Sequence, residues 1–335
     1  MELGKVSESV LKRSVLKYTQ QNNKTVSNAC QLINEANIGT DASLFAVSGA
    51  VMASATAVSI GRRQDVATEA VINACNNLVC TKAEPVAVQI ALVLPEALYE
   101  SELRHMMEAA KEYAKQNQLM ILGGHTTVSK FVTETIATVT AFGYVKEDAL
   151  QETCVPEAGM DIVMSKWIGL QGTAKLAAEQ KEVLLKRLPV RFISQAASYK
   201  EYMSITEEAR IAMQQGVCMM HDVSGGGIFR ALWELAEKAE TGIRIELKKI
   251  PVKQETIEIC EIFGLNPYEL LAGGALLMVT PHGDELTEKL AAAGISSAVI
   301  GRLTGDNDRV IVTYGEDGEE LRYLDRPRND EIDKV

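Results

Sequence analysis

The residues best suited to chemistry in this chain lie in one short stretch, residues 220–227, with the sequence Met-His-Asp-Val-Ser-Gly-Gly-Gly. An apolar run ends at Met220, and apolar residues return over residues 228–240 at the spacing of an amphipathic helix. The pattern predicts a strand, a glycine loop and a helix start, where amides without helical partners can bind an anion. The candidate phosphate-binding residues are Ser224, Gly225, Gly226 and Gly227.

Two aspartates are candidate metal ligands. Asp222 stands just before the glycine loop, where its carboxylate could hold a divalent cation against a phosphate and take part in catalysis. Asp41 lies in the sequence Gly-Thr-Asp-Ala ahead of an apolar run and could assist the same cation. Each also has a structural interpretation, because a helix N-cap would explain Asp222 and an Asx-turn would explain Asp41.

A second glycine cluster, Gly123-Gly124-His125-Thr126, follows a short apolar run. Its backbone amides and hydroxyl could contact a phosphate or the substrate, and His125 could act as an acid or base. A loop histidine at a strand end is the structural alternative. Lys5 could reach a phosphate, although a solvated terminal lysine is the simpler interpretation.

Few carboxylates accompany these candidates. An enzyme that binds a metal–nucleotide complex needs several acidic groups around its cations. We expect strand-end turns at three further positions, and these carry the neutral residues Thr56, Asn77 and Gln171. The sequence therefore leaves Asp41 and Asp222 to provide most of the negative charge.

Length and composition narrow the class of protein. The chain has 335 residues, 47% of them hydrophobic, which is enough for two domains with separate cores. Its net charge of −11 argues against general nucleic-acid binding, and the longest apolar runs are too short to span a membrane. Six scattered cysteines and four histidines without metal-ligand spacing predict free thiols, no zinc site and a cytoplasmic location.

Helix and strand patterns alternate along the chain, which indicates an α/β or α+β fold. The polar stretch 146–159 marks the boundary between predicted domains 1–150 and 151–335. Strands are expected at residues 46–60, 86–94, 119–122, 132–144, 161–165, 216–220, 243–247, 275–280 and 297–302. Helices are expected at residues 10–17, 65–81, 97–117, 174–188, 205–215, 228–240, 252–263 and 284–293.

These motifs together resemble the aminoimidazole ribonucleotide (AIR) synthase superfamily. Its members include a hydrogenase maturation factor, selenophosphate synthetase and thiamine-monophosphate kinase. The resemblance covers nearly the whole chain and is most specific in the second half. The motifs that carry it lie at residues 39–42, 83–85, 123–126, 169–173, 204–209, 220–227, 250–252, 264–267, 273–275 and 300–302. Residues 4–5 and 330–331 look most like the hydrogenase maturation branch.

The resemblance implies a two-domain fold. Its N-terminal α/β domain would form a β-barrel across a homodimer, and a C-terminal α/β domain would pack on it. It also implies ATP and Mg²⁺ as cofactors, with phosphoryl transfer to an amide or another small acceptor that a protein could carry. Four family carboxylates are neutral here, at Thr56, Asn77, Thr127 and Gln171, and the branch's C-terminal cysteine tail is missing.

Two functions therefore stay open. The chain is an ATP-dependent, hydrogenase-maturation-like enzyme, or it is a dimeric scaffold or ligand sensor that has lost catalysis. A third arrangement would recruit another carboxylate to the metal, and Asp65, Glu69 and Glu84 are the candidates.

Overall fold

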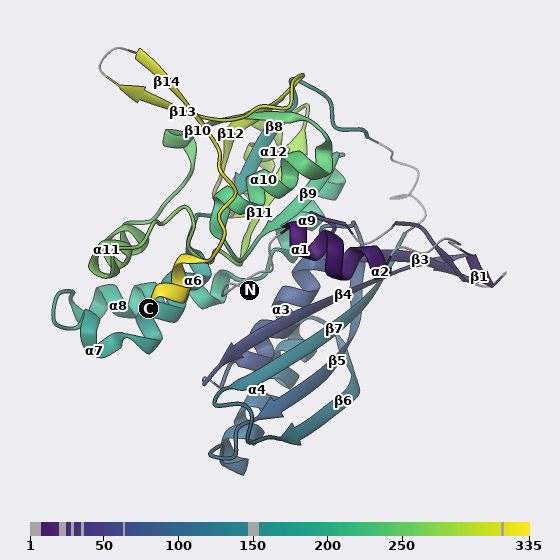
Figure 1. Ribbon diagram of the computed structural model, residues 1–335, viewed down its shortest axis with the longest axis vertical. Helices are drawn as coiled ribbons and strands as arrows, with labels where there is room; N and C mark the ends of the chain where they lie inside the picture. The colour runs from purple at the N-terminus through teal and green to yellow at the C-terminus, as the bar shows by residue number, and fades with distance from the viewer. Residues whose placement is uncertain are drawn as a thin grey trace. The chain divides into compact units, whose positions relative to one another are not determined.

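The computed structural model describes residues 8–19, 25–27, 30–34, 37–62, 64–146, 154–315 and 318–335. The chain divides into two compact units (Figure 1). One unit comprises Gln20–Ala36 and Asp41–Gln151, and the other comprises Met1–Thr19, Asn37–Thr40 and Glu152–Val335. The second unit therefore includes two segments from the first 40 residues, in addition to the C-terminal half.

The unit containing residues 41–151 is a seven-stranded sheet covered by helices. Its strands are β1 (Thr25–Ser27), β2 (Cys30–Leu32), β3 (Ser43–Val47), β4 (Ala50–Gly61), β5 (Glu84–Leu94), β6 (Met120–Val128) and β7 (Thr135–Val145). They lie in the order β1-β2-β3-β4-β7-β5-β6, and of these pairs only β5 and β6 run parallel. Helices α3 (Val66–Val79) and α4 (Glu100–Gln116) pack on the sheet through a shared apolar core.

Two strand predictions in this unit were wrong. The run 46–60 is not one strand but part of a hairpin, because Ser48 and Gly49 both take positive φ (49° and 89°), as a tight two-residue turn requires. The strand predicted to stop at Leu122 continues to Val128 as β6. Gly124 is needed inside that strand, because a Cβ there would overlap the carbonyl oxygen of Ile90 on β5.

The other unit contains a second seven-stranded sheet, in the order β14-β13-β10-β12-β8-β11-β9. Its strands are β8 (Asp161–Ser165), β9 (Met219–Val223), β10 (Gly242–Glu246), β11 (Ala275–Thr280), β12 (Ser297–Thr304), β13 (Arg309–Gly315) and β14 (Gly318–Tyr323). Helices α9 (Thr206–Gln214), α10 (Gly227–Ala239) and α12 (Gly283–Ala292) pack against it. All six residues of β11 are buried, which explains its uninterrupted apolar sequence.

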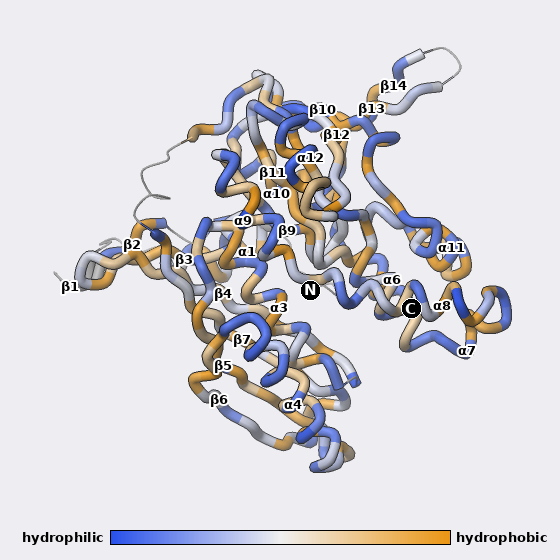
Figure 2. The backbone as a smooth tube through the Cα atoms, turned by 180° about the vertical axis from the view of Figure 1, so that it is seen from behind, coloured by the Kyte–Doolittle hydropathy of each residue, from blue (hydrophilic) through white to orange (hydrophobic). Residues whose placement is uncertain are grey.

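Four shorter helices of this unit surround a smaller core: α6 (Leu170–Glu179), α7 (Lys181–Leu184), α8 (Val190–Ala197) and α11 (Gln254–Phe263). The helix predicted from Ala174 begins earlier, at Leu170, directly after Gly169 (φ 64°). Strands β13 and β14 were not predicted. All six residues of β14 are exposed, and Figure 2 colours them mostly hydrophilic, so no apolar alternation marks this strand.

The cysteine prediction was wrong for one pair. Cys154 and Cys218 form a disulfide, with their Cα atoms 4.7 Å apart, although 64 positions separate them in the sequence. Cys75 and Cys260 are free thiols and are buried, as expected, and Cys80 is also buried. Among the described residues, no helix combines the length and apolar character needed to cross a membrane.

Candidate functional site

The stretch singled out in the sequence folds in the predicted order of strand β9, glycine loop and helix α10, but the strand runs from Met219 to Val223 and so includes His221 and Asp222. β9 pairs with β11 so that His221 faces Leu277 and Asp222 faces Leu276. Both side chains belong to the last three residues of the strand and are buried, at 3% and 9% exposure. The strand end therefore holds an imidazole and a carboxylate out of bulk water.

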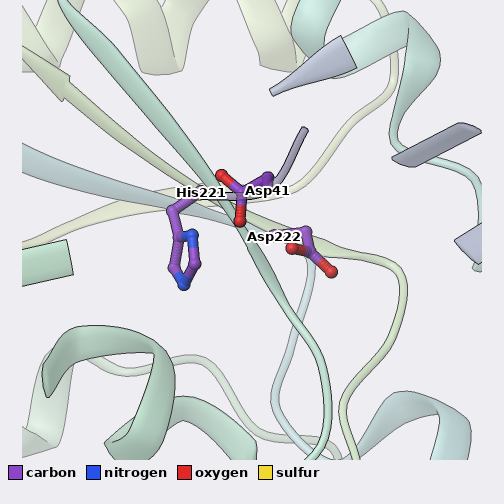
Figure 3. A group of neighbouring side chains, drawn as sticks. All are labelled: Asp41, His221 and Asp222. Carbon is purple, nitrogen blue, oxygen red and sulfur yellow. The ribbon is translucent and has the colours of Figure 1, made fainter. Parts of the chain in front are cut away.

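Asp41 joins these two residues (Figure 3). Each of Asp41, His221 and Asp222 offers one ligand atom, and these atoms lie within 4.8 Å of one another. Asp41 directly follows the segment Asn37–Thr40, which belongs to the same compact unit as β9. That segment packs closely on α10, since a Cβ at Gly39 would lie 2.9 Å from the carbonyl oxygen of Glu234.

The chemistry of this donor set fits a divalent cation. Asp41 and Asp222 were the predicted metal ligands, and two carboxylates suffice for Mg²⁺ when phosphate and water supply the other oxygens. His221 was not a predicted site residue, because it has no histidine partner at helical spacing in the sequence. An imidazole nitrogen is a poor ligand for Mg²⁺ but a good one for Mn²⁺, Fe²⁺ or Zn²⁺.

The carboxylate of Glu234 on α10 lies close to the imidazole of His221. The Nε2 atom of His221 lies 3.5 Å from an Oε of Glu234, and the other Oε accepts a 3.1 Å hydrogen bond from Arg326. Arg326 also stacks 4.9 Å from the ring centre of Trp233 on the same helix. A carboxylate in this position fixes the orientation of an imidazole that binds a metal.

The glycine loop does not present all its amides to solvent. The Gly226 amide donates to the Asp330 carboxylate at 2.6 Å, and the Gly227 amide donates to the Ser224 carbonyl at 3.2 Å. The amide of Phe229 donates to the carbonyl of Tyr268. The loop therefore binds an anionic oxygen, as its sequence suggested, but that oxygen belongs to the chain's own C-terminal segment.

Helix α10 and the backbone at residues 268–269 explain why glycine is required in the loop. Gly226 has φ 86°, and a Cβ there would come within 2.8 Å of the Arg230 side chain at Cδ. Gly227 has φ 65°, and its Cβ would lie 2.8 Å from backbone atoms of Glu269. These glycines permit close packing of the loop rather than an open cradle.

A buried ion pair supports the strand next to β9. The ammonium of Lys166 contacts the carboxylate of Glu208 at 2.5 Å and donates to the carbonyl oxygens of Tyr202, Ser204 and Gly274. Gly274 directly precedes β11, the strand that pairs with His221 and Asp222. Burial lowers the pKa of Lys166, and the neighbouring Glu208 opposes that shift.

The other predicted site residues lie elsewhere. Gly123, Gly124, His125 and Thr126 are exposed residues inside the edge strand β6, not a loop at a strand end, so that structural prediction was wrong. Lys5 lies outside the described residues.

Strand-end turns were also predicted at the neutral residues Thr56, Asn77 and Gln171, but none of these three residues lies in such a turn. Thr56 lies inside β4, and its hydroxyl is 3.0 Å from that of Thr140 on β7. Asn77 is in the last turn of α3, and Gln171 is buried in the first turn of α6. Turn positions were inferred from local sequence, but Thr56 lies within a continuous strand, and Asn77 and Gln171 lie within helices.

The three alternative metal ligands suggested by the sequence, Asp65, Glu69 and Glu84, are not members of the candidate metal-binding group. Among the described residues, the group able to hold a metal contains Asp41, His221 and Asp222. Glu84 is engaged in its own unit, where Lys146 lies 2.9 Å away and Tyr144 donates at 3.1 Å. The hydrogen bond from Lys146 lowers the pKa of Glu84.

Two family models match this chain and define its class. AIR synthase related protein, N-terminal domain, matches residues 33–145, and AIR synthase related protein, C-terminal domain, matches residues 157–313. The chain belongs to the AIR synthase related proteins, which confirms the resemblance and the two-domain α/β fold.

Several of the proteins most similar to this chain are hydrogenase maturation proteins. The chain is 28% identical over 277 residues to a putative hydrogenase expression/formation protein of Methanocaldococcus jannaschii, with 81% of this chain and 79% of that protein aligned. A chain of a HypE–HypF complex superposes with a TM-score of 0.72 at 20% identity, covering 87% of this chain and 94% of that one. HypE in complex with ATP superposes with a TM-score of 0.63 at 17% identity, covering 97% and 96%.

Proposed function

We propose that this chain is a hydrogenase-maturation-like protein that binds ATP, or another phosphorylated ligand, together with a divalent cation. The observation that carries the proposal is the convergence of Asp41, His221 and Asp222 immediately before the glycine loop. A structural relative, HypE, has been solved in complex with ATP, which supports the choice of ligand.

In this proposal Asp41 and Asp222 hold the cation, and His221 is a third ligand oriented by Glu234. The cation, when bound, would neutralise phosphate charge, which is the main requirement of phosphoryl transfer. Ser224 and the glycines Gly225, Gly226 and Gly227 would contact the phosphate. His125, Gly123, Gly124, Thr126 and Lys5 stay predicted contacts for the ligand or the transferred group.

Calorimetry tests the metal role directly. ATP with Mg²⁺, and then ATP with Mn²⁺, is titrated into the wild type, into Asp222→Asn and into Asp284→Asn. Asp284 is an exposed aspartate on α12 and serves as the matched control. We expect binding to weaken at least about tenfold in Asp222→Asn and to stay unchanged in the control, because one charged ligand contributes more than 1.4 kcal/mol. Equal affinity in all three proteins would remove Asp222 from the site.

A second candidate function is a catalytically inactive scaffold or ligand sensor of the same fold. The contact between the Thr56 and Thr140 hydroxyls supports it, because a cross-strand threonine pair stands where the family resemblance places a carboxylate. ADP release from ATP across a panel of amides and small acceptors separates the two functions. Sustained turnover that disappears in Asp41→Asn would exclude the scaffold.

The resemblance also leads us to propose a homodimer, a substrate amide that is small or borne by a protein, and a cytoplasmic location. The exposed edge strand β6 carries apolar residues that a partner copy could cover, with Met120 at 65% and Val128 at 62% exposure. Size-exclusion chromatography with light scattering tests the dimer, and a monomer at micromolar concentration would contradict it.

A further inference from the structure

The last residues of the chain fold back along the start of helix α10 (Figure 1). After β14, Leu324 joins the apolar core of the sheet, and Arg326 pairs with Glu234. The buried guanidinium of Arg230 then donates to the carbonyl oxygens of Pro327 and Arg328, each at 2.6 Å. Two side chains in the first two turns of α10, Arg230 and Glu234, therefore bind the C-terminal segment, residues 325–335. The contacts of Arg230 are to backbone carbonyl oxygens, so they depend on the position of the segment's backbone.

The segment places one carboxylate against the glycine loop. One oxygen of Asp330 accepts from the amide of Gly226 at 2.6 Å. The other accepts from the amides of Leu271 at 2.9 Å and Ile332 at 3.0 Å. Asp330 is 9% exposed, so this anion is held by backbone dipoles and not by water. The arrangement matches the way a loop at a helix N-terminus binds a phosphate oxygen.

Further contacts anchor the segment on both sides of Asp330. The carboxylate of Glu331 accepts from the amide of Asn266 at 3.0 Å and contacts Lys334 at 2.5 Å. Ile332 packs against the small core formed by α6, α8 and α11. Residues 325–335 belong to no strand of the sheet, so the segment can lift without breaking a strand pairing.

We propose that residues 325–335 form an autoinhibitory strap, in which Asp330 occupies the anion position of the glycine loop and must leave before a phosphate group binds at Gly226. This inference rests on the proposed function only in taking a phosphorylated molecule as the ligand. The strap lowers the apparent affinity of the ligand by the fraction of molecules in which it is lifted. It also adds a negative charge beside the position of an incoming phosphate, which strengthens the competition.

Inorganic pyrophosphate without metal is the probe, because it requires the anion position but not the aspartate ligands of the cation. It is titrated by calorimetry into the full-length wild type, Asp330→Asn, Asp330→Ala and Asp333→Ala. Asp333 is an exposed acidic residue of the same segment and serves as the control. We expect both Asp330 variants to bind pyrophosphate at least about tenfold more tightly than the wild type and the control, the equivalent of one charge-assisted hydrogen bond. Folded Asp330 variants with unchanged affinity would overturn the strap.

Hydrogen exchange of the wild type tests the strap even if the Asp330 variants do not fold. Saturating pyrophosphate should increase exchange at the amides of residues 331–335, as the strap lifts. Pyrophosphate binding with unchanged protection there would overturn the proposal. Mg-ATP binding by the wild type with the strap still protected would refute the strap and leave the proposed function standing. Tight pyrophosphate binding only after Asp330→Ala, with Mg-ATP excluded from the wild type, would support the strap and count against the proposed function of the intact chain.

Discussion

Replacing Glu208 by glutamine would leave the buried ammonium of Lys166 without its counter-charge. The Lys166 and Glu208 side chains are 8% and 3% exposed, so water cannot take the place of the lost carboxylate. Removing one partner of a buried pair typically costs about 3–5 kcal/mol. The three carbonyl oxygens that also accept from Lys166 remain in Glu208→Gln, and we therefore expect a loss near the lower end, about 3 kcal/mol.

Urea unfolding followed by tryptophan fluorescence measures this loss of stability. Both tryptophans, Trp167 and Trp233, lie in the same compact unit as the ion pair, so their fluorescence reports the unfolding of that unit. Glu207→Gln is the matched control: it is the neighbouring residue on α9, and its ion pair with Arg210 is about half exposed on both sides. We expect no measurable change in that variant, since exposed pairs contribute little.

The pH dependence supplies an independent check. Burial already lowers the pKa of Lys166 below its ordinary value of 10.5, and loss of Glu208 removes a contact that raises it. The unfolded chain then binds more protons than the folded chain between the folded pKa and 10.5, so stability must rise with pH across that window. The rise should be steeper in Glu208→Gln than in the wild type. A variant as stable as Glu207→Gln, with no steeper rise, would refute the assignment of a buried ion pair.

Three further predictions concern thiols and one carboxylate. Burial raises the pKa of Cys75 and of Cys260 to about 12, so alkylation of the folded chain at pH 8 should be slow at both and fast after unfolding, as peptide mass mapping would show. Reduction of the disulfide between Cys154 and Cys218, which closes a loop of 64 positions, should lower the free energy of unfolding by about 4 kcal/mol in urea titrations with and without reductant. Burial raises the pKa of Asp330, so the folded chain binds its proton more tightly; the stability of the wild type relative to Asp330→Asn should fall as pH rises from about 3.8 through the folded pKa. A difference that stays constant between pH 4 and 7 would contradict that assignment.

Local sequence was sufficient where one element follows the next. The run ending at Met220, the glycines and the apolar spacing of residues 228–240 correctly predicted β9, the loop and α10. Asp222 was placed correctly beside that loop for the same reason. Local pattern failed where a turn or a close approach depended on another strand, as at Ser48 and in the extended glycines of β6.

The sequence by itself determined the family and the alternation of helices and strands, and it supplied two aspartates as candidate metal ligands, because these depend on residue type and on spacing along the chain. Only the tertiary structure decided which distant groups meet there. Asp330 reaches the amide of Gly226 across 104 positions, and Asp41 reaches His221 through the packing of a short segment on α10. The periodicity of the sequence does not predict these long-range contacts. They follow from the order of strands in a sheet and from the burial of side chains between elements far apart in sequence.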